Sequence, residues 1–259
     1  MSEALHAEWT KLRTLPDAGW LLLGVVAATV IISATVSAAV SCTSAAACHV
    51  DITKLSLTGT YLSQAIVAIL AVLAVSGEYG TGMIATTLAA MPHRTTVLAA
   101  KAAVVTAVTL AAGIPAVLGS VLAGRLILPG HGYTPANGYP VLSLADGTVL
   151  RAVAGTVVYL ALIALLSLGV AVAVRDAAVA IGVVLGLLYL FPILIQVVGS
   201  PGVARRLEQI GPMTAGLEIQ ASTGLRHLPI APWAGLGVLA AWAAAALLAG
   251  ALLLRLRDA

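Results

Sequence analysis

Six long apolar runs constrain this chain more than any other feature, because each is about as long as a helix that crosses a membrane. A bilayer core of about 30 Å takes about 20 apolar residues in helical form. The composition agrees, since 61% of the residues are apolar and only 9% are charged, whereas soluble domains carry about 25% charged residues. We therefore predict an all-α integral membrane protein.

The runs predict one transmembrane domain covering residues 1–259, with six spans joined by polar connections. An even number of spans puts both termini on the same side of the membrane. The predicted spans are about 20–40, 59–76, 97–124, 150–174, 177–198 and 233–254.

The distribution of basic residues gives only a weak indication of orientation. With the N-terminus inside, seven of the 13 Lys and Arg residues are cytosolic and six are outside, so the positive-inside rule is nearly balanced. The short basic hairpin after residue 174 and the basic C-terminus favour cytoplasmic termini in the plasma membrane. The small-residue run at the end of span one resembles a cleavage site, but the span is too long for a signal peptide and acidic residues precede it.

The connections between the spans carry their own signals. Residues 4–15 predict an amphipathic helix on the membrane surface, with Trp9 at headgroup level. Pro16 and Asp17 are expected to break this helix, and Trp20 to open the first span. The connections at 41–58 and 125–149 are expected to be polar or irregular, and short interfacial helices are expected within 199–232.

Two further features concern how the spans are held together. Cys42 and Cys48 follow the first span closely, so they form either a disulfide in an oxidising compartment or two buried thiols. Gly182 and Gly186 have the GxxxG spacing that lets helices approach closely, although the motif is weak in a chain rich in small residues.

Residues 77–96 interrupt the apolar pattern between spans two and three. We expect a loop with a short helix at about 82–91, which Thr81 caps. An apolar ridge formed by Ile84, Leu88 and Met91 suits a groove on a partner protein. Glu78 lies where the positive end of that helix favours an acid. The alternative is an interfacial helix that rests on lipid.

Several kinds of chemistry are not predicted. No lysine follows a glycine, so the phosphate-binding G-x-x-x-x-G-K-[ST] loop is missing. The five histidines are dispersed, and neither H-E-x-x-H nor G-x-S-x-G occurs. We therefore predict no catalytic residue, metal site or cofactor in this chain. A basic stripe with stacking aromatics is also missing, which argues against nucleic acid.

The polar residues inside the spans are few. They either line a substrate path or form interhelical hydrogen bonds and interfacial contacts. A membrane enzyme that modifies lipids would need polar residues clustered at one depth, and the sequence shows no such cluster. The candidates for a substrate path are Tyr61, Gln64, Tyr189 and Gln196, and Tyr159 is a further polar residue of this kind.

Three segments together resemble the type-2 ABC exporter permeases of actinobacteria. They are EWTKLRT before the first span, SGEYGTGMIATTLAAMPHR with the following VLAAK after the second, and the C-terminal LLRLRDA. The resemblance covers the whole chain, and the second segment is its most specific part.

The resemblance implies a subunit with an N-terminal connecting helix, a cytosolic coupling helix between spans two and three, and short external helices before span six. Such subunits pair as homodimers or heterodimers and bind two separate ATPase subunits, which hold ATP and Mg. The coupling element falls on Glu78, Tyr79, Gly80, Thr81, Gly82 and Met83, followed by the ridge of Ile84, Leu88 and Met91.

The chain departs from its relatives at Ala85 and His93, where they often carry basic residues, so contact with the ATPase is expected to be less electrostatic. An alternative function is a non-transporting membrane anchor or sensor that docks a cytosolic partner through the same helix.

Overall fold

The computed structural model describes residues 16–42, 50–80 and 94–257, which form helices with no strand among them. Six helices in these ranges are long and apolar enough to cross a membrane. The prediction of an all-helical chain with six helices that could span a membrane is therefore confirmed for the described residues. These helices are α2 (Pro16–Ala39), α4 (Thr60–Gly80), α6 (Arg94–Ile127), α7 (Gly147–Val174), α8 (Ala177–Val197) and α11 (Pro232–Arg257).

Several helix ends differ from the prediction. Helix α2 begins at Pro16 instead of Trp20, because proline lacks an N–H and is well suited to the first helical position. Helix α4 continues to Gly80, so the prediction of a loop beginning at Gly77 is wrong. A glycine costs a helix only about 1 kcal/mol, less than leaving backbone groups without hydrogen bonds near lipid. Helix α6 also begins early, at Arg94.

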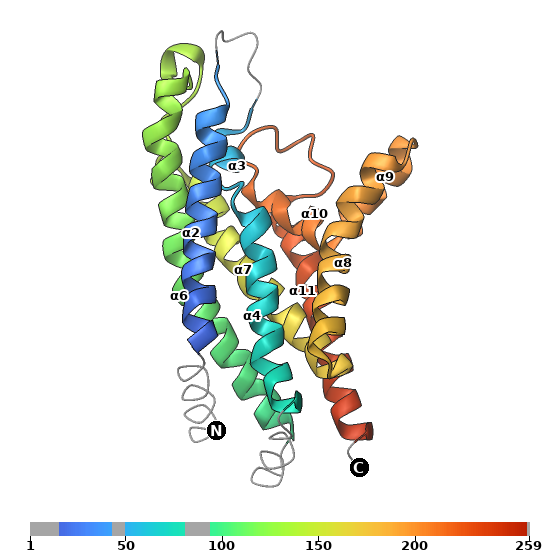
Figure 1. The fold of residues 1–259 in the computed structure, drawn as a ribbon. Helices are drawn as coiled ribbons and strands as arrows, with labels where there is room; N and C mark the ends of the chain where they lie inside the picture. The colour runs from blue at the N-terminus through green and yellow to red at the C-terminus, as the bar shows by residue number, and fades with distance from the viewer. Residues whose placement is uncertain (1–15, 43–49, 81–93, 258–259) are drawn as a thin grey trace.

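Helix α7 is the centre of the bundle. It packs against α4, α6, α8 and α11, while α2 packs against α4 and α6. Figure 1 shows α2 and α6 on one side of α4 and α7, with α8 and α11 on the other. Helices α6 and α8 continue through Pro115 and Pro192.

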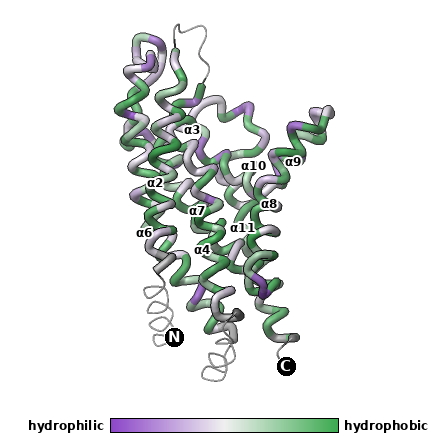
Figure 2. The backbone as a smooth tube through the Cα atoms, in the orientation of Figure 1, coloured by the Kyte–Doolittle hydropathy of each residue, from purple (hydrophilic) through white to green (hydrophobic). Residues whose placement is uncertain are grey.

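The two ends of the bundle differ in structure. One end, here called the terminal end, holds the start of α2, the end of α11 and the two helix ends that border residues 81–93 (Figure 1). The other, called the distal end, holds short helices, and Figure 2 shows hydrophilic segments there. The short helices are α3 (Ile52–Ser56), η1 (Leu128–His131), η2 (Pro135–Asn137), α9 (Pro201–Ile210), α10 (Pro212–Leu217) and η3 (Glu218–Gln220).

The connections predicted as polar or irregular are thus partly helical. Residues 41–58 contain α3, and residues 125–149 contain the end of α6, η1, η2 and the first residues of α7. Residues 199–232 contain α9, α10 and η3.

A two-residue hairpin joins α7 to α8 at the terminal end. Arg175 ends α7 in the left-handed region, with φ of 65°. Asp176 then caps α8 by accepting a hydrogen bond from the Val179 N–H at 2.8 Å. The two helices are antiparallel and in contact, as the hairpin predicts.

Glycines allow close helix contacts at positions other than the GxxxG pair. A Cβ atom added at Gly169 of α7 would lie 2.5 Å from the Ala246 carbonyl carbon and the Leu247 nitrogen of α11. A Cβ atom at Gly182 or Gly186 would meet no atom within 4 Å. The close approach of α7 and α11 therefore depends on Gly169, whereas Gly182 and Gly186 make no such contact within the described part of the chain.

Candidate functional site

The four candidate residues of the substrate path come together at the distal end. Tyr61 and Gln64 lie in the first turns of α4, and Tyr189 and Gln196 lie in the later part of α8, which runs toward the same end. The Tyr189 hydroxyl donates a hydrogen bond to the Tyr61 carbonyl oxygen, which joins the two helices directly.

Gln64 is a buried link between helices. The Tyr159 hydroxyl of α7 donates to the Gln64 Oε1 atom. The Gln64 Nε2 atom lies 3.2 Å from the Tyr61 carbonyl oxygen and 3.1 Å from the Met213 sulfur. Gln64 and Tyr159 are fully buried, so Gln64 matches the interhelical alternative more closely than a wall of an open path.

A second buried amide lies beside this link. Gln220, in η3, places its Nε2 atom 3.3 Å from the hydroxyl oxygens of both Thr60 and Thr156. Its Oε1 atom is buried and has no hydrogen-bond partner.

These contacts join α4 and α7 to α10 and η3, so polar residues that are scattered along the sequence lie together in the structure. Sequence reasoning missed the cluster because its members are far apart in the chain. We call the following set the polar seam: Thr60, Gln64, Thr156, Tyr159, Met213 and Gln220.

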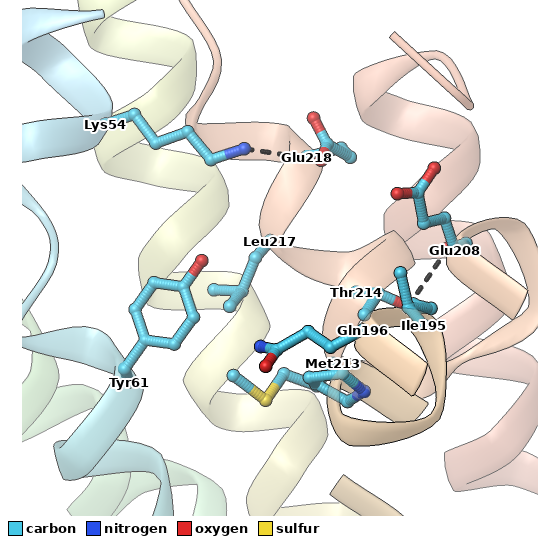
Figure 3. A pocket seen from close by; sticks show the side chains of 10 residues that line it. Lys54, Tyr61, Ile195, Gln196, Glu208, Met213, Thr214, Leu217 and Glu218 are labelled. Carbon is cyan, nitrogen blue, oxygen red and sulfur yellow. Dashed lines mark hydrogen bonds and ion pairs between the residues drawn. The ribbon is translucent and has the colours of Figure 1, made fainter. Parts of the chain in front are cut away.

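A pocket of about 210 Å³, here called the distal pocket, lies beside the polar seam. Tyr61 and Gln196 line it, whereas Gln64 and Tyr189 are not among the lining residues and instead donate hydrogen bonds to the Tyr61 carbonyl oxygen. Figure 3 shows the Tyr61 ring on one side of the pocket and the Gln196 amide on another. The lining residues are Lys54, Tyr61, Pro192, Ile195, Gln196, Glu208, Met213, Thr214, Leu217 and Glu218.

Charged residues line the pocket on the side where the membrane helices end. The Lys54 ammonium lies 3.3 Å from Oε1 of Glu218. The other carboxylate oxygen of Glu218 is buried and has no hydrogen-bond partner. Glu208 of α9 adds a second carboxylate. The sequence gives no local sign of this pairing, because Lys54 and Glu218 are 164 residues apart.

Asp51 links α3 to the segment that follows η3 at the distal end. Its side chain caps α3 by accepting hydrogen bonds from the Thr53 and Lys54 N–H groups, at 3.0 and 3.2 Å. It also accepts from the Ser222 hydroxyl at 2.7 Å and from the Ser222 and Thr223 N–H groups. Burial raises the pKa of the Asp51 carboxyl, but the hydrogen bonds from Ser222, Thr223 and Lys54 outweigh burial and hold the pKa below its ordinary value.

The predicted coupling element lies mostly outside the described residues. Glu78, Tyr79 and Gly80 form the last turn of α4. The rest of the element and the predicted helix at 82–91 fall outside the described ranges, as does the N-terminal helix at 4–15. The residues concerned are Thr81, Gly82, Met83, Ile84, Leu88 and Met91.

The disulfide stays a prediction. Cys42 is buried, and its N–H donates to the His131 carbonyl oxygen at 2.8 Å. Cys48 lies outside the described residues. Within the described part of the chain, no group of three His, Cys, Asp or Glu side chains is placed to hold a metal ion.

Comparison with known protein families and with curated proteins finds no match for this chain.

Proposed function

We propose that this chain is the transmembrane subunit of an ATP-driven ABC exporter in the plasma membrane. In this proposal the distal pocket is part of the substrate path, and residues 78–91 bind a separate ATPase subunit. The ATPase binds ATP and Mg and hydrolyses the nucleotide. A second permease subunit, identical or different, completes the transporter.

The observation that carries the proposal is the position of α4. Its first turns bear Tyr61, which lines the distal pocket, and Gln64, which joins the polar seam. Its last turn bears Glu78, Tyr79 and Gly80, the start of the predicted coupling element. At 1.5 Å per residue, its 21 residues extend about 30 Å. One rigid helix therefore connects the two places at which an exporter must act.

The proposed mechanism is a tilt of α4. Closure of the ATPase subunits on ATP pushes the coupling element and shifts α4 relative to α7 and α8, with which it is in contact. The shift exchanges the hydrogen bonds of Gln64 and Tyr189 and reshapes the pocket wall at Tyr61. Coupling of this kind needs different contacts in the two states.

The decisive experiment measures ATP hydrolysis by a reconstituted complex of this chain with the ABC-type ATPase subunit that the proposal requires. We compare substrate-stimulated hydrolysis in wild type, Glu78→Arg and Thr87→Pro, which puts a proline in the middle of the predicted helix at 82–91. The proposal expects stimulation to fall about tenfold or more in Thr87→Pro, since a proline inside a helix costs about 3 kcal/mol. Unchanged stimulation in both variants contradicts it.

A control variant tests whether the effect of the proline is specific to the predicted coupling helix. Gly237→Pro, in the first turns of α11 at the distal end, tests whether a proline far from residues 78–91 has the same effect.

Two outcomes favour the alternative functions. The anchor or sensor alternative is indicated if the chain captures an ATPase but the pair drives no export, and if deletion causes no resistance or export defect. Turnover of lipid by the isolated chain indicates the enzyme alternative.

A further inference from the structure

We infer that the distal pocket recognises the cationic group of an amphipathic molecule, such as a protonated amine on a compact apolar body. This inference rests on the proposed function, because it assigns a substrate class to the same path. The evidence is the pairing of charges in the pocket, its position at the end of the membrane helices, and the division of its lining.

The charges in the lining do not balance. Two carboxylates, Glu208 and Glu218, face one ammonium, that of Lys54. Lys54 contacts only Oε1 of Glu218, and Oε2 is buried with no hydrogen-bond partner. Within the described part of the chain, Glu208 makes no ion pair, and its residue is only partly exposed. The partly exposed Glu208 carboxylate is therefore the group open to a ligand N–H, and a charge-assisted hydrogen bond to it is favoured.

The lining is divided between charged and apolar groups. The carboxylates come from segments beyond the ends of the membrane spans, whereas Ile195 and Pro192 belong to α8. Figure 3 shows Lys54 and both glutamates toward one side of the pocket, with Gln196 and Met213 toward the other. A molecule with a charged head and an apolar body therefore fits with its head toward the glutamates.

Tyr61 gives the pocket an aromatic face that suits a cation. Its residue is 40% exposed, and its backbone is fixed by hydrogen bonds from Gln64 and Tyr189. An aromatic face attracts a cation but not an anion. The volume of about 210 Å³ limits the bound part to a compact group rather than a large sugar chain.

The test uses two probes that differ only in the sign of their charge, 1-aminoadamantane and adamantane-1-carboxylate. Binding to the purified full chain in lipid nanodiscs is measured by calorimetry, without any ATPase. We expect saturable binding of the amine and at least about tenfold weaker binding of the carboxylate. Equal affinity for both probes would overturn the inference.

Three variants locate the binding. Glu208→Gln removes the carboxylate that makes no ion pair. This variant is expected to weaken amine binding about tenfold. Lys54→Met frees Glu218 and is expected to strengthen amine binding. Asp176→Asn, a change at the opposite end that retains the cap of α8, is the matched control and is expected to bind as wild type does. No change in the first two variants would also overturn the inference.

The outcome is separable from that of the proposed function. If amine binding depends on Glu208 but the chain does not couple to an ATPase, the inference about the pocket is supported and the exporter function is contradicted. If the chain couples to an ATPase but the pocket does not prefer cations, the exporter function is supported and this substrate class is contradicted.

Discussion

Asp51 is the residue whose charge state most directly holds the distal end together. Its two carboxylate oxygens accept hydrogen bonds from α3 on one side and from Ser222 and Thr223 on the other. An asparagine has only one acceptor oxygen, and its amide N–H₂ would meet N–H donors. The site therefore requires a carboxylate and not merely a polar side chain of the same size.

We predict that Asp51→Asn lowers the free energy of unfolding by about 1–3 kcal/mol, because backbone donors lose their acceptor. The measurement is thermal unfolding in detergent, followed by intrinsic fluorescence. The control is Asp146→Asn, an exposed cap of α7, where asparagine caps as well as aspartate. An equal effect of the two substitutions would contradict the role of Asp51.

The lowered pKa of Asp51 predicts a pH dependence. A carboxyl whose pKa is lower in the folded state stabilises the fold above its unfolded value, which is about 3.9. This contribution is lost as the pH falls through the folded pKa. The difference in Tm between wild type and Asp51→Ala should therefore be constant from pH 7 to about pH 5 and shrink below about pH 4. A difference that grows on acidification would contradict this prediction.

A third prediction at the residue scale concerns the buried pair of Gln64 and Tyr159. Tyr159→Phe leaves the Gln64 Oε1 atom without the hydroxyl that now donates to it, and we expect a loss of about 1–3 kcal/mol in stability. Gln64→Leu in the same protein should recover part of that loss, since no buried acceptor then lacks a donor. A double-mutant cycle measures this coupling, and purely additive effects would contradict it.

At the scale of the helix, the contact between α7 and α11 depends on the absence of a side chain at Gly169. An added Cβ atom would meet the α11 backbone at 2.5 Å, and backbone cannot move aside as a flexible side chain does. A single methyl group is therefore enough to separate the central helix from its neighbour.

We predict that Gly169→Ala destabilises the protein by about 1–3 kcal/mol, the usual cost of overpacking. Gly182→Ala is the matched control in another membrane helix, where an added Cβ atom meets nothing within 4 Å. There alanine should be neutral or stabilise α8 by up to about 1 kcal/mol. Equal effects in the two helices, measured by thermal unfolding, would show that helix contact does not set the response.

The same comparison shows what the sequence can predict at this scale. The centre of each span could be predicted, because an apolar run of about 20 residues is a local signal. Helix ends were harder, as at Gly80, where glycine suggests a break that the surroundings override. The role of the GxxxG glycines could not be predicted, because it depends on which helix passes opposite them.

At the scale of the whole molecule, the site was only half predictable. Tyr61 and Gln64 could be identified as polar residues within an apolar span. Their partners could not, because Tyr159 is 95 residues from Gln64 and Met213 is 149 residues away. Pairings across such distances are fixed by the packing of whole helices, for which a single sequence holds no local signal.

The orientation of the molecule in the membrane gives the last prediction. With Cys42 and Cys48 replaced by serine, a new cysteine is placed at Arg226 or at Asp176, which are exposed at the distal and terminal ends. If the termini are cytoplasmic, a membrane-impermeant maleimide labels Arg226→Cys in intact cells. It should label Asp176→Cys only after permeabilisation. The reverse pattern would place the distal end in the cytoplasm.

The hydrogen bonds between Asp51 and Ser222 also set an order in time. The two residues are 171 positions apart, and synthesis at about 5–20 residues per second takes roughly 9–34 s to cover that distance. Helices α2, α4, α6, α7 and α8 all lie N-terminal to Ser222, so they are synthesised before these bonds form. The nascent chain thus passes through a stage in which five membrane helices have been made while the hydrogen bonds between Asp51 and Ser222 have not yet formed.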